Sequence, residues 1–273
     1  MRGNLFFKDG QVGKLPVVIW LHPLSYHSGY NEGYGVQGTT VYHRMAENGF
    51  AVIAYDQCGF GLRLLEGSVF YERHPRWSRL GRMVMDARDA VSFAVEGKGA
   101  TSGAIPELDE DRVFLLGYST GALTAMYAGA LDDRLAGVAC FSGWTPLRDA
   151  TKATATGGNR RQWDLHALQP KLGWFDGREG DIPFDYHDML GQVLPKPCLI
   201  VTPKRDRFAD HSAITEAIKQ LRLAKPKQAE AASAHLTSRM KATTQQQQEK
   251  HEDERLRKAE ALHEAAQART EAS

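Results

Sequence analysis

The stretch Phe114–Leu123, FLLGYSTGAL, passes directly from the apolar pattern of a buried strand to the small-residue pattern of a helix. At the junction, Ser119 has a glycine two residues away on each side, Gly117 and Gly121. Two interpretations compete. The serine is an ordinary helix N-cap beside glycines that permit a tight turn, or it is a nucleophile held above a sheet edge at a strand-to-helix elbow. The strand before it and the helix after it favour the nucleophile.

The composition is that of a globular α/β protein. Of the 273 residues, 42% are hydrophobic, which is enough for one sizeable domain with additional segments. The 34 basic and 33 acidic residues nearly cancel, so the charge predicts neither a nucleic-acid partner nor a membrane partner. We find no signal peptide and no apolar run of transmembrane length, and we expect a soluble protein, cytoplasmic by default.

Cysteine and histidine spacing gives no sign of a metal or disulfide framework. Cys58 follows a predicted strand, and Cys140 and Cys198 lie inside apolar runs. We therefore expect all three to be reduced residues of the core. No ligand cluster has a suitable spacing, so no metal and no cofactor is expected.

Strand-like and helix-like runs alternate through the first 225 residues. The predicted strands are Pro16–Leu21, Phe50–Tyr55, Val113–Leu116, Leu135–Phe141 and Pro197–Thr202. The predicted helices are Met83–Val95, Ala122–Ala130 and Ser212–Leu223. This alternation predicts an α/β fold with a mainly parallel sheet and helices on both faces. Sites in such sheets form at the carboxyl ends of the strands.

Two segments differ from this alternation. Residues 143–191 are irregular and rich in tryptophan and glycine, and we expect them to form a cap-like insertion in a domain that spans residues 1–225. Residues 226–273 are dominated by Ala, Glu, Lys, Arg and Gln and have few large apolar side chains. This composition predicts a solvated helix or a disordered tail.

Several motifs resemble the α/β-hydrolase superfamily. They are GYSTG around Ser119, LHP at Leu21–Pro23 after one strand, and DQCGFG at Asp56–Gly61 after the next. Together with FSGWTP (Phe141–Pro146) and VTPKRD (Val201–Asp206), they look most like serine esterases of the acetyl xylan esterase and dienelactone hydrolase-like group. The resemblance covers about residues 15–225 and is weak for the substrate.

The resemblance implies a set of site residues in the chain order serine, acid, histidine. Ser119 would be the nucleophile and Asp206 the acid, with Asp210 as a nearby alternative and a solvated loop aspartate as the plain interpretation. The backbone N–H groups of Thr120 and Leu24 would form the oxyanion hole. His22 and Trp144 are candidates for substrate binding, although either could instead anchor a loop or pack the insertion.

The histidine of this set has several candidates. His235 is the best candidate by chain order, followed by His211, His251 and His263. We expect His211 to start the helix after Asp206 and to point away from the strand end. The amino end has room for only one strand before Pro16, and no strand pattern follows Leu223. The antiparallel strand that starts the superfamily fold, and its eighth strand, are therefore expected to be missing.

These features predict a serine carboxylesterase that forms an acyl-enzyme on a small-molecule or carbohydrate ester, such as an acyl group on a sugar. Two alternatives stay open. One is a binding or scaffold protein that keeps the fold without a base, and the other is a lactone hydrolase or peptidase of the same fold. The sequence leaves the oligomeric state open.

Overall fold

The chain divides into two compact units, Met1–Ala229 and Glu230–Ser273. The computed structural model describes residues 2–11, 13–31, 39–96, 106–154, 157–230, 234 and 257. Of the second unit it describes only Glu230, Ala234 and Arg257, which are all helical. All of the architecture that follows belongs to the first unit.

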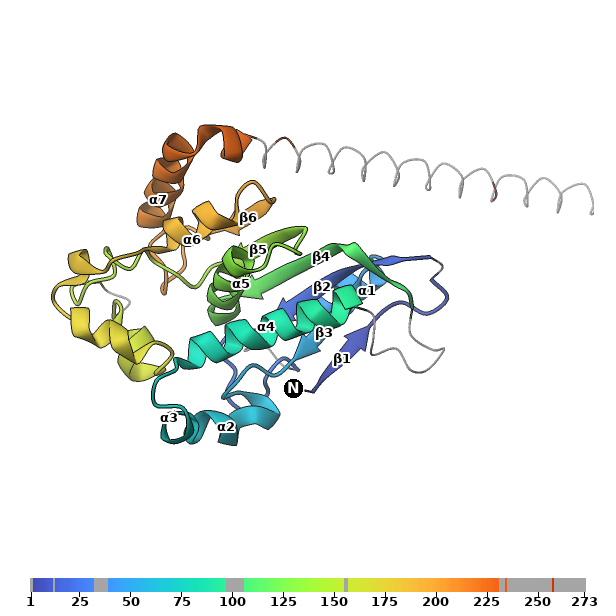
Figure 1. Ribbon diagram of the computed structural model, residues 1–273, viewed down its shortest axis with the longest axis horizontal. Helices are drawn as coiled ribbons and strands as arrows, with labels where there is room; N and C mark the ends of the chain where they lie inside the picture. Colours follow the sequence, from blue (N-terminus) through green and yellow to red (C-terminus); the bar gives the residue numbers. More distant parts are fainter. Residues whose placement is uncertain are drawn as a thin grey trace, which may run out of the picture. The chain divides into compact units, whose positions relative to one another are not determined.

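The first unit is built on a six-stranded sheet of order β1-β3-β2-β4-β5-β6 in the described part of the chain (Figure 1). The strands are β1 (Gly3–Phe6), β2 (Leu15–Leu21), β3 (Ala51–Tyr55), β4 (Leu108–Tyr118), β5 (Gly137–Phe141) and β6 (Cys198–Val201). Strands β2 to β6 are parallel to one another, and each contains a predicted strand or most of one.

The expectation that the initial antiparallel strand would be missing is wrong. The single strand at the amino end, β1, pairs antiparallel with β3, with Gly3 opposite Tyr55 and Phe6 opposite Val52. A strand's direction depends on which neighbour it pairs with, and the local pattern of four residues does not contain that information. At the other edge, β6 is the last strand among the described residues.

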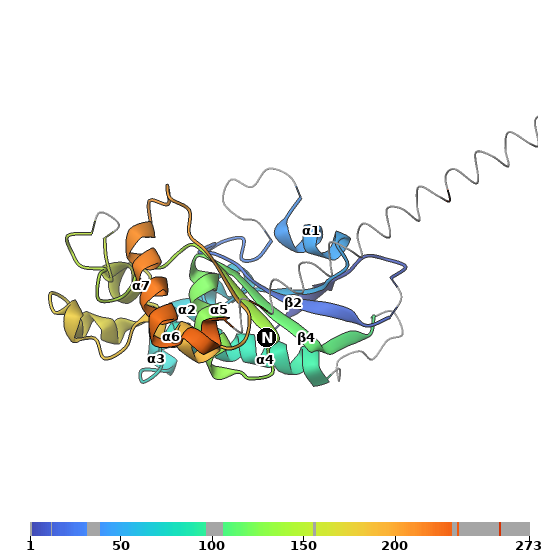
Figure 2. The same ribbon diagram turned by 90° about the horizontal axis from the view of Figure 1, so that it is seen from above.

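The helices cover the two faces of the sheet unequally. Helix α1 (Val41–Glu47) lies on one side, whereas α4 (Arg79–Glu96), α5 (Thr120–Leu131) and α6 (Tyr186–Val193) lie on the other (Figure 2). The remaining helices are α2 (Leu64–Ser68), α3 (Phe70–Arg73), α7 (His211–Ala224) and the further helical segments η1 (Gly61–Arg63), η2 (Arg161–Leu165), η3 (Pro170–Phe175) and η4 (Glu179–Asp181). No described helix is both long enough and apolar enough to span a membrane.

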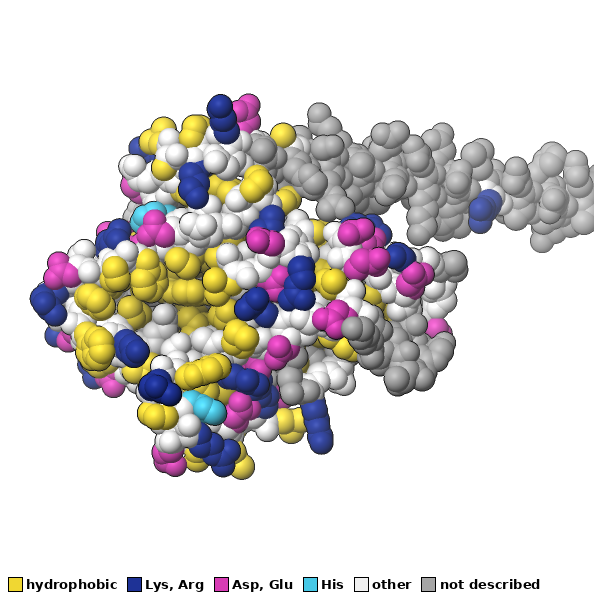
Figure 3. Space-filling view, viewed as in Figure 1, with side chains coloured by type: hydrophobic (Ala, Val, Ile, Leu, Met, Phe, Trp, Pro, Cys, Tyr) yellow, Lys and Arg dark blue, Asp and Glu magenta, His cyan; other side chains and the backbone are white. Residues whose placement is uncertain are grey.

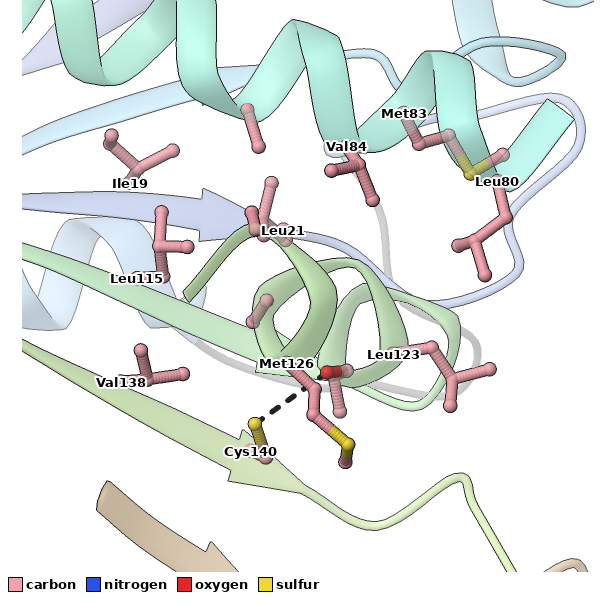
Figure 4. Close-up of a cluster of buried hydrophobic side chains, with 14 of the residues drawn as sticks. Ile19, Leu21, Leu80, Met83, Val84, Leu115, Leu123, Met126, Val138 and Cys140 are labelled. Carbon is pink, nitrogen blue, oxygen red and sulfur yellow. Dashed lines mark hydrogen bonds between the residues drawn. The ribbon is translucent and has the colours of Figure 1, made fainter. Parts of the chain in front are cut away.

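The main core lies between the sheet and helices α4 and α5. Side chains of the two central strands, such as Ile19 and Leu115, meet Met83 of α4 and Met126 of α5 (Figure 4). All four are fully buried. The buried positions of α4 recur at three- and four-residue spacing, which is why the sequence predicts this helix correctly.

The opposite face of the sheet is covered only in part. Val18 and Trp20 of β2 and Val52 of β3 pack against Tyr42 and Ala46 of α1 in a smaller cluster. Farther along the same face, the side chains of Tyr118 in β4 and Leu199 in β6 are 47% and 46% exposed. Both side chains lie on the same face of the sheet as that of Phe141 in β5. Tyr118 is directly opposite Phe141, and Leu199 is directly opposite Ala139, which is two residues before Phe141 and therefore points to the same face. This apolar strip is uncovered in the described part of the chain.

The predicted insertion is ordered around one buried carboxylate. Asp185 is 1% exposed and caps α6, while its Oδ1 and Oδ2 accept hydrogen bonds from the N–H groups of Leu147 (2.7 Å) and Arg148 (3.1 Å). Trp144 packs edge-on against Tyr186, the first residue of α6, with the ring centres 5.5 Å apart. Hydrophobic side chains gather around a hollow on the face of the molecule shown in Figure 3.

The unequal covering of the sheet predicts unequal costs for the same substitution on its two faces. Leu115→Ala should cost about 3 kcal/mol of unfolding free energy, because Leu115 is fully buried against the helices. Leu199→Ala should cost less than about 1 kcal/mol, because nearly half of Leu199 is already in water. Urea unfolding of both variants measures the difference. Equal costs would show that Leu199 is covered in solution.

Candidate active site at the carboxyl edge of the sheet

Ser119 occupies the turn between β4, which ends at Tyr118, and α5, which begins at Thr120. Its backbone dihedrals are φ 55° and ψ −117°, a conformation that costs free energy for any residue other than glycine. The turn is held because the N–H of Ser119 donates to the carbonyl of Phe141 in the adjacent strand (2.9 Å). Ser119 itself is partly exposed. This is the elbow geometry that the sequence predicts.

The two glycines of the motif are required because backbone segments approach closely there. A Cβ on Gly121 would overlap the carbonyl oxygen of Leu21, and a Cβ on Gly117 would overlap the backbone of Gly121. A third close approach brings the loop after β5 to the serine, since a Cβ on Gly143 would overlap the Cα of Ser119. Side chains at these positions would separate β2, β4 and α5 and move the serine.

The predicted oxyanion donors lie on two elements that meet below the serine. Thr120 is the first residue of α5, and the first N–H groups of a helix have no acceptor within the helix. The positive end of the helix dipole also lies there, where it stabilises negative charge. Leu24 follows β2 in the loop that begins at His22 and is partly buried. The carbonyl of Leu21, at the start of this loop, is the atom that approaches Gly121.

His22 is enclosed and neutral. Its side chain is 1% exposed, and burial lowers its pKa from 6.5 to about 4, against the opposing effects of its bond to Pro23 and the charge of Asp56. Nδ1 donates to the carbonyl of Pro23 (2.7 Å), and Nε2 accepts from the N–H of Gln57 (3.0 Å). Both ring nitrogens therefore hold the loop together. A direct contact between His22 and a substrate stays a prediction, and the same holds for Trp144, which is 2% exposed.

The two candidate acids, Asp206 and Asp210, have different hydrogen-bond partners. Asp210 caps α7, because its Oδ1 accepts from the N–H and hydroxyl of Ser212, and the hydroxyl bond is the main cause of its lowered pKa. Asp206 accepts from the hydroxyl of Ser142 and from the N–H of Phe208 (2.8 Å). Ser142 directly precedes Gly143, the residue in contact with Ser119. This proximity favours Asp206 over Asp210 as the acid.

Of the candidate histidines, the structure describes His211. His235, His251 and His263 lie outside the described residues. His211 is the first residue of α7, as predicted, but it does not point away from the strand end. Its Nδ1 is 3.0 Å from the carbonyl oxygen of Thr202, the residue that follows β6. The sequence ranks His211 below His235 as the catalytic base because it is expected to point away from the strand end, and its position beside Thr202 contradicts that reason.

The structure adds three polar residues that the sequence did not single out, Tyr26, Arg161 and Ser142. Tyr26 lies two residues after Leu24, and its hydroxyl is 2.9 Å from Nδ1 of His166 in the insertion. Burial lowers the pKa of His166, and the nearby charges of Arg161 and Arg79 lower it further. Arg161 also stacks on the ring of Phe208, 4.3 Å from its centre, beside Asp206. Tyr26 and Arg161 reach the site through contacts between segments far apart in the sequence, which no local pattern predicts. Ser142 could have been found from the sequence, because it directly follows a predicted strand.

A reactive cysteine or a group of metal-binding side chains would be another source of chemistry in the described part of the chain. The three cysteines are unpaired, and burial raises the pKa of both Cys58 and Cys198 to about 12, so neither is a thiolate at neutral pH. Among the described residues, no three His, Cys, Asp or Glu side chains come together in a group that suits a metal ion.

Comparison with known proteins identifies a family. The family model described as serine aminopeptidase, S33, matches residues 24–173. This range contains the elbow, the loop after β2 and most of the insertion. No curated protein matches the chain significantly.

Solved structures share the fold. A carbohydrate esterase family 15 glucuronoyl esterase from Caldicellulosiruptor kristjansonii is 21% identical, with a TM-score of 0.56 over 81% of this chain and 62% of that chain. A recombinant glucuronoyl esterase from Sporotrichum thermophile is 17% identical, with a TM-score of 0.56 over 82% and 59%. The 2,6-dihydroxy-pseudo-oxynicotine hydrolase is 19% identical, with a TM-score of 0.50 over 81% of this chain and 57% of that chain. The chain thus spans less than two thirds of the length of these structures.

The buried neutral state of His22 predicts part of the pH dependence of stability. Its contribution is fully present above pH 6.5 and is lost as the pH falls from 6.5 to about 4, because the unfolded chain binds the proton first. The loss is on the order of 3 kcal/mol. Denaturant unfolding between pH 7 and pH 4 should show a smaller decrease in His22→Gln than in the wild type. Val17→Ala provides the control, because it lowers stability without removing an ionisable group and should keep the wild-type slope.

Proposed function

Since the chain belongs to the serine aminopeptidase S33 family, we propose that it is a serine hydrolase that cleaves a carboxylic ester through an acyl-enzyme. The observation that carries this proposal is the conformation of Ser119, with φ 55° between a buried strand and the first turn of a helix. Strain of this kind persists where the surrounding structure requires it, and it is concentrated at functional sites.

The proposed reaction uses Ser119 as the nucleophile. Its Oγ forms a bond to the ester carbonyl carbon while its proton passes to a histidine nitrogen, and the carbonyl oxygen becomes an oxyanion. The N–H groups of Thr120 and Leu24 stabilise that oxyanion. The C–O bond to the alcohol then breaks, and the alcohol leaves with the proton. Water repeats the sequence on the acyl-enzyme and releases the acid.

Asp206 is the proposed orienting acid. It would accept the hydrogen bond of the base histidine and stabilise its protonated form. Its existing partners, Ser142 and Phe208, leave lone pairs on both carboxylate oxygens for that bond. These partners also fix the carboxylate against the loop that contacts Ser119, which is the geometry an orienting group requires.

The proposed substrate is an ester of a carbohydrate. The support is the named activity of structural relatives, since glucuronoyl esterases are carbohydrate esterases with this fold. Peptide amides are a competing substrate class because of the family's name, and lactones share the same chemistry. A protein without a functional base would instead be a binding protein of this fold.

Ser119→Ala tests the nucleophile. A fluorophosphonate probe should label the wild type and leave the variant unlabelled, because only the Ser119 hydroxyl is activated. Hydrolysis of a small activated ester should fall by several orders of magnitude. The matched control is Ser68→Ala, which removes an exposed serine hydroxyl of α2 and should still be labelled. Equal labelling of wild type and Ser119→Ala would exclude the serine mechanism.

Substitution of each histidine identifies the base. If His235 is the base, as chain order indicates, His235→Ala should lower ester turnover by several orders of magnitude with little change in melting temperature. His211→Ala should have a much smaller effect. Ester turnover and thermal unfolding of both variants are the measurements. The reverse result would assign the base to His211, and wild-type turnover in both would exclude a triad built on either residue.

A further inference from the structure

We propose that Gln57 is a positioning residue for this reaction, because it joins the two elements that carry the oxyanion donors. The proposal rests on the function given above. One donor, Leu24 N–H, lies on the loop after β2, and the other, Thr120 N–H, begins α5. Gln57 belongs to neither element. It follows β3 and makes hydrogen bonds to both.

Gln57 makes two hydrogen bonds to the loop that carries Leu24. Its side-chain Nε2 donates to the carbonyl of His22 (2.7 Å), and its backbone N–H donates to Nε2 of His22 (3.0 Å). Since His22 Nδ1 donates to the carbonyl of Pro23, the imidazole is fixed in one tautomer. These bonds hold the chain on both sides of Pro23, directly before Leu24.

A third hydrogen bond connects Gln57 to helix α5. The hydroxyl of Thr124 donates to Oε1 of Gln57 (2.9 Å). Thr124 lies one turn after Thr120, and its Oγ1 is also 3.2 Å from the Thr120 carbonyl oxygen. The side-chain amide therefore spans from the loop after β2 to Thr124 of α5, one turn after Thr120. Gln57 and Thr124 are both 0% exposed, so water does not compete for these bonds.

The residue before Gln57 fixes the far end of the same loop. The side chain of Asp56, which is 4% exposed, accepts from the N–H of Tyr30 (3.0 Å) and from the N–H of Leu62 (2.8 Å). The loop after β2 is thus held at His22 by Gln57 and at Tyr30 by Asp56. Asp56 supports the loop as a whole, whereas only Gln57 also reaches α5.

This arrangement matters for catalysis because an oxyanion hole depends on the distance between its donors. Two N–H groups stabilise the transition state only if both reach the same oxygen. Small displacements of groups that position the reaction cost large factors in rate. Without the amide of Gln57, the loop and the helix would lose the polar link that runs through this side chain, and the donors could move apart while the fold stays intact.

The test is a set of variants assayed on a small activated ester. Gln57→Met keeps most of the volume and removes both side-chain bonds, and Thr124→Val removes the bond to the helix. Both should lower kcat by about 10- to 100-fold with little change in KM. Thr124→Ser, which keeps the hydroxyl, should retain wild-type kcat. Val17→Ala is the stability control, because Val17 is fully buried near the amino end of β2, and it should lower Tm without changing kcat.

A transition-state analogue distinguishes positioning from general destabilisation. A trifluoromethyl ketone gives an oxyanion when Ser119 adds to it, so its Ki should rise in Gln57→Met and Thr124→Val by the same factor by which kcat/KM falls. Unchanged kcat and Ki in folded variants would overturn the proposal. If Gln57→Met does not fold, the difference between Thr124→Val and Thr124→Ser decides. A wild type that neither turns over esters nor is labelled at Ser119 would overturn the proposed function and this inference together.

Discussion

The close approach of three backbone segments around Ser119 is the constraint on which the rest of the structure depends. β4 must end, turn sharply and start α5 while the end of β2 and the loop after β5 lie within van der Waals contact of the turn. The strained φ of 55° at Ser119 is the result. The N–H···O bond from Ser119 to Phe141 and the missing Cβ atoms at Gly117 and Gly121 allow it.

The polar groups under this turn are buried, and they are stable only because they are paired. Removing a polar side chain from water costs free energy unless it finds partners in the protein. His22, Gln57 and Thr124 satisfy one another, which requires His22 to stay neutral. The same arrangement links stability to pH and ties the candidate oxyanion loop to the helix. A purely apolar packing of these three elements would give stability but would not fix their relative spacing.

Helices cover one face of the sheet more fully than the other, so the two sides of the elbow at Ser119 have different surroundings. On the face of α4 and α5, the core reaches from Ile19 to Met126 without interruption. On the other face, α1 packs against residues of β2 and β3, and in the described part of the chain Tyr118 of β4 and Leu199 of β6 are nearly half exposed. Tyr118 directly precedes the serine, so the elbow is packed on its helix side and partly exposed to solvent on the other.

The sequence by itself determined the elements that depend on local pattern. The strand, the turn and the helix around Ser119 could be predicted, because strand and helix periodicity and the required glycines are written within ten consecutive residues. The start of α7 at His211 and the parallel strands follow the same logic. What only the tertiary structure decided are pairings between distant residues: the antiparallel direction of β1, the bond from Ser142 to Asp206, the orientation of His211 toward Thr202 and the hydrogen bonds of Gln57. Each joins segments that the chain brings together only when the sheet forms, and no local periodicity encodes which partner a polar group will meet.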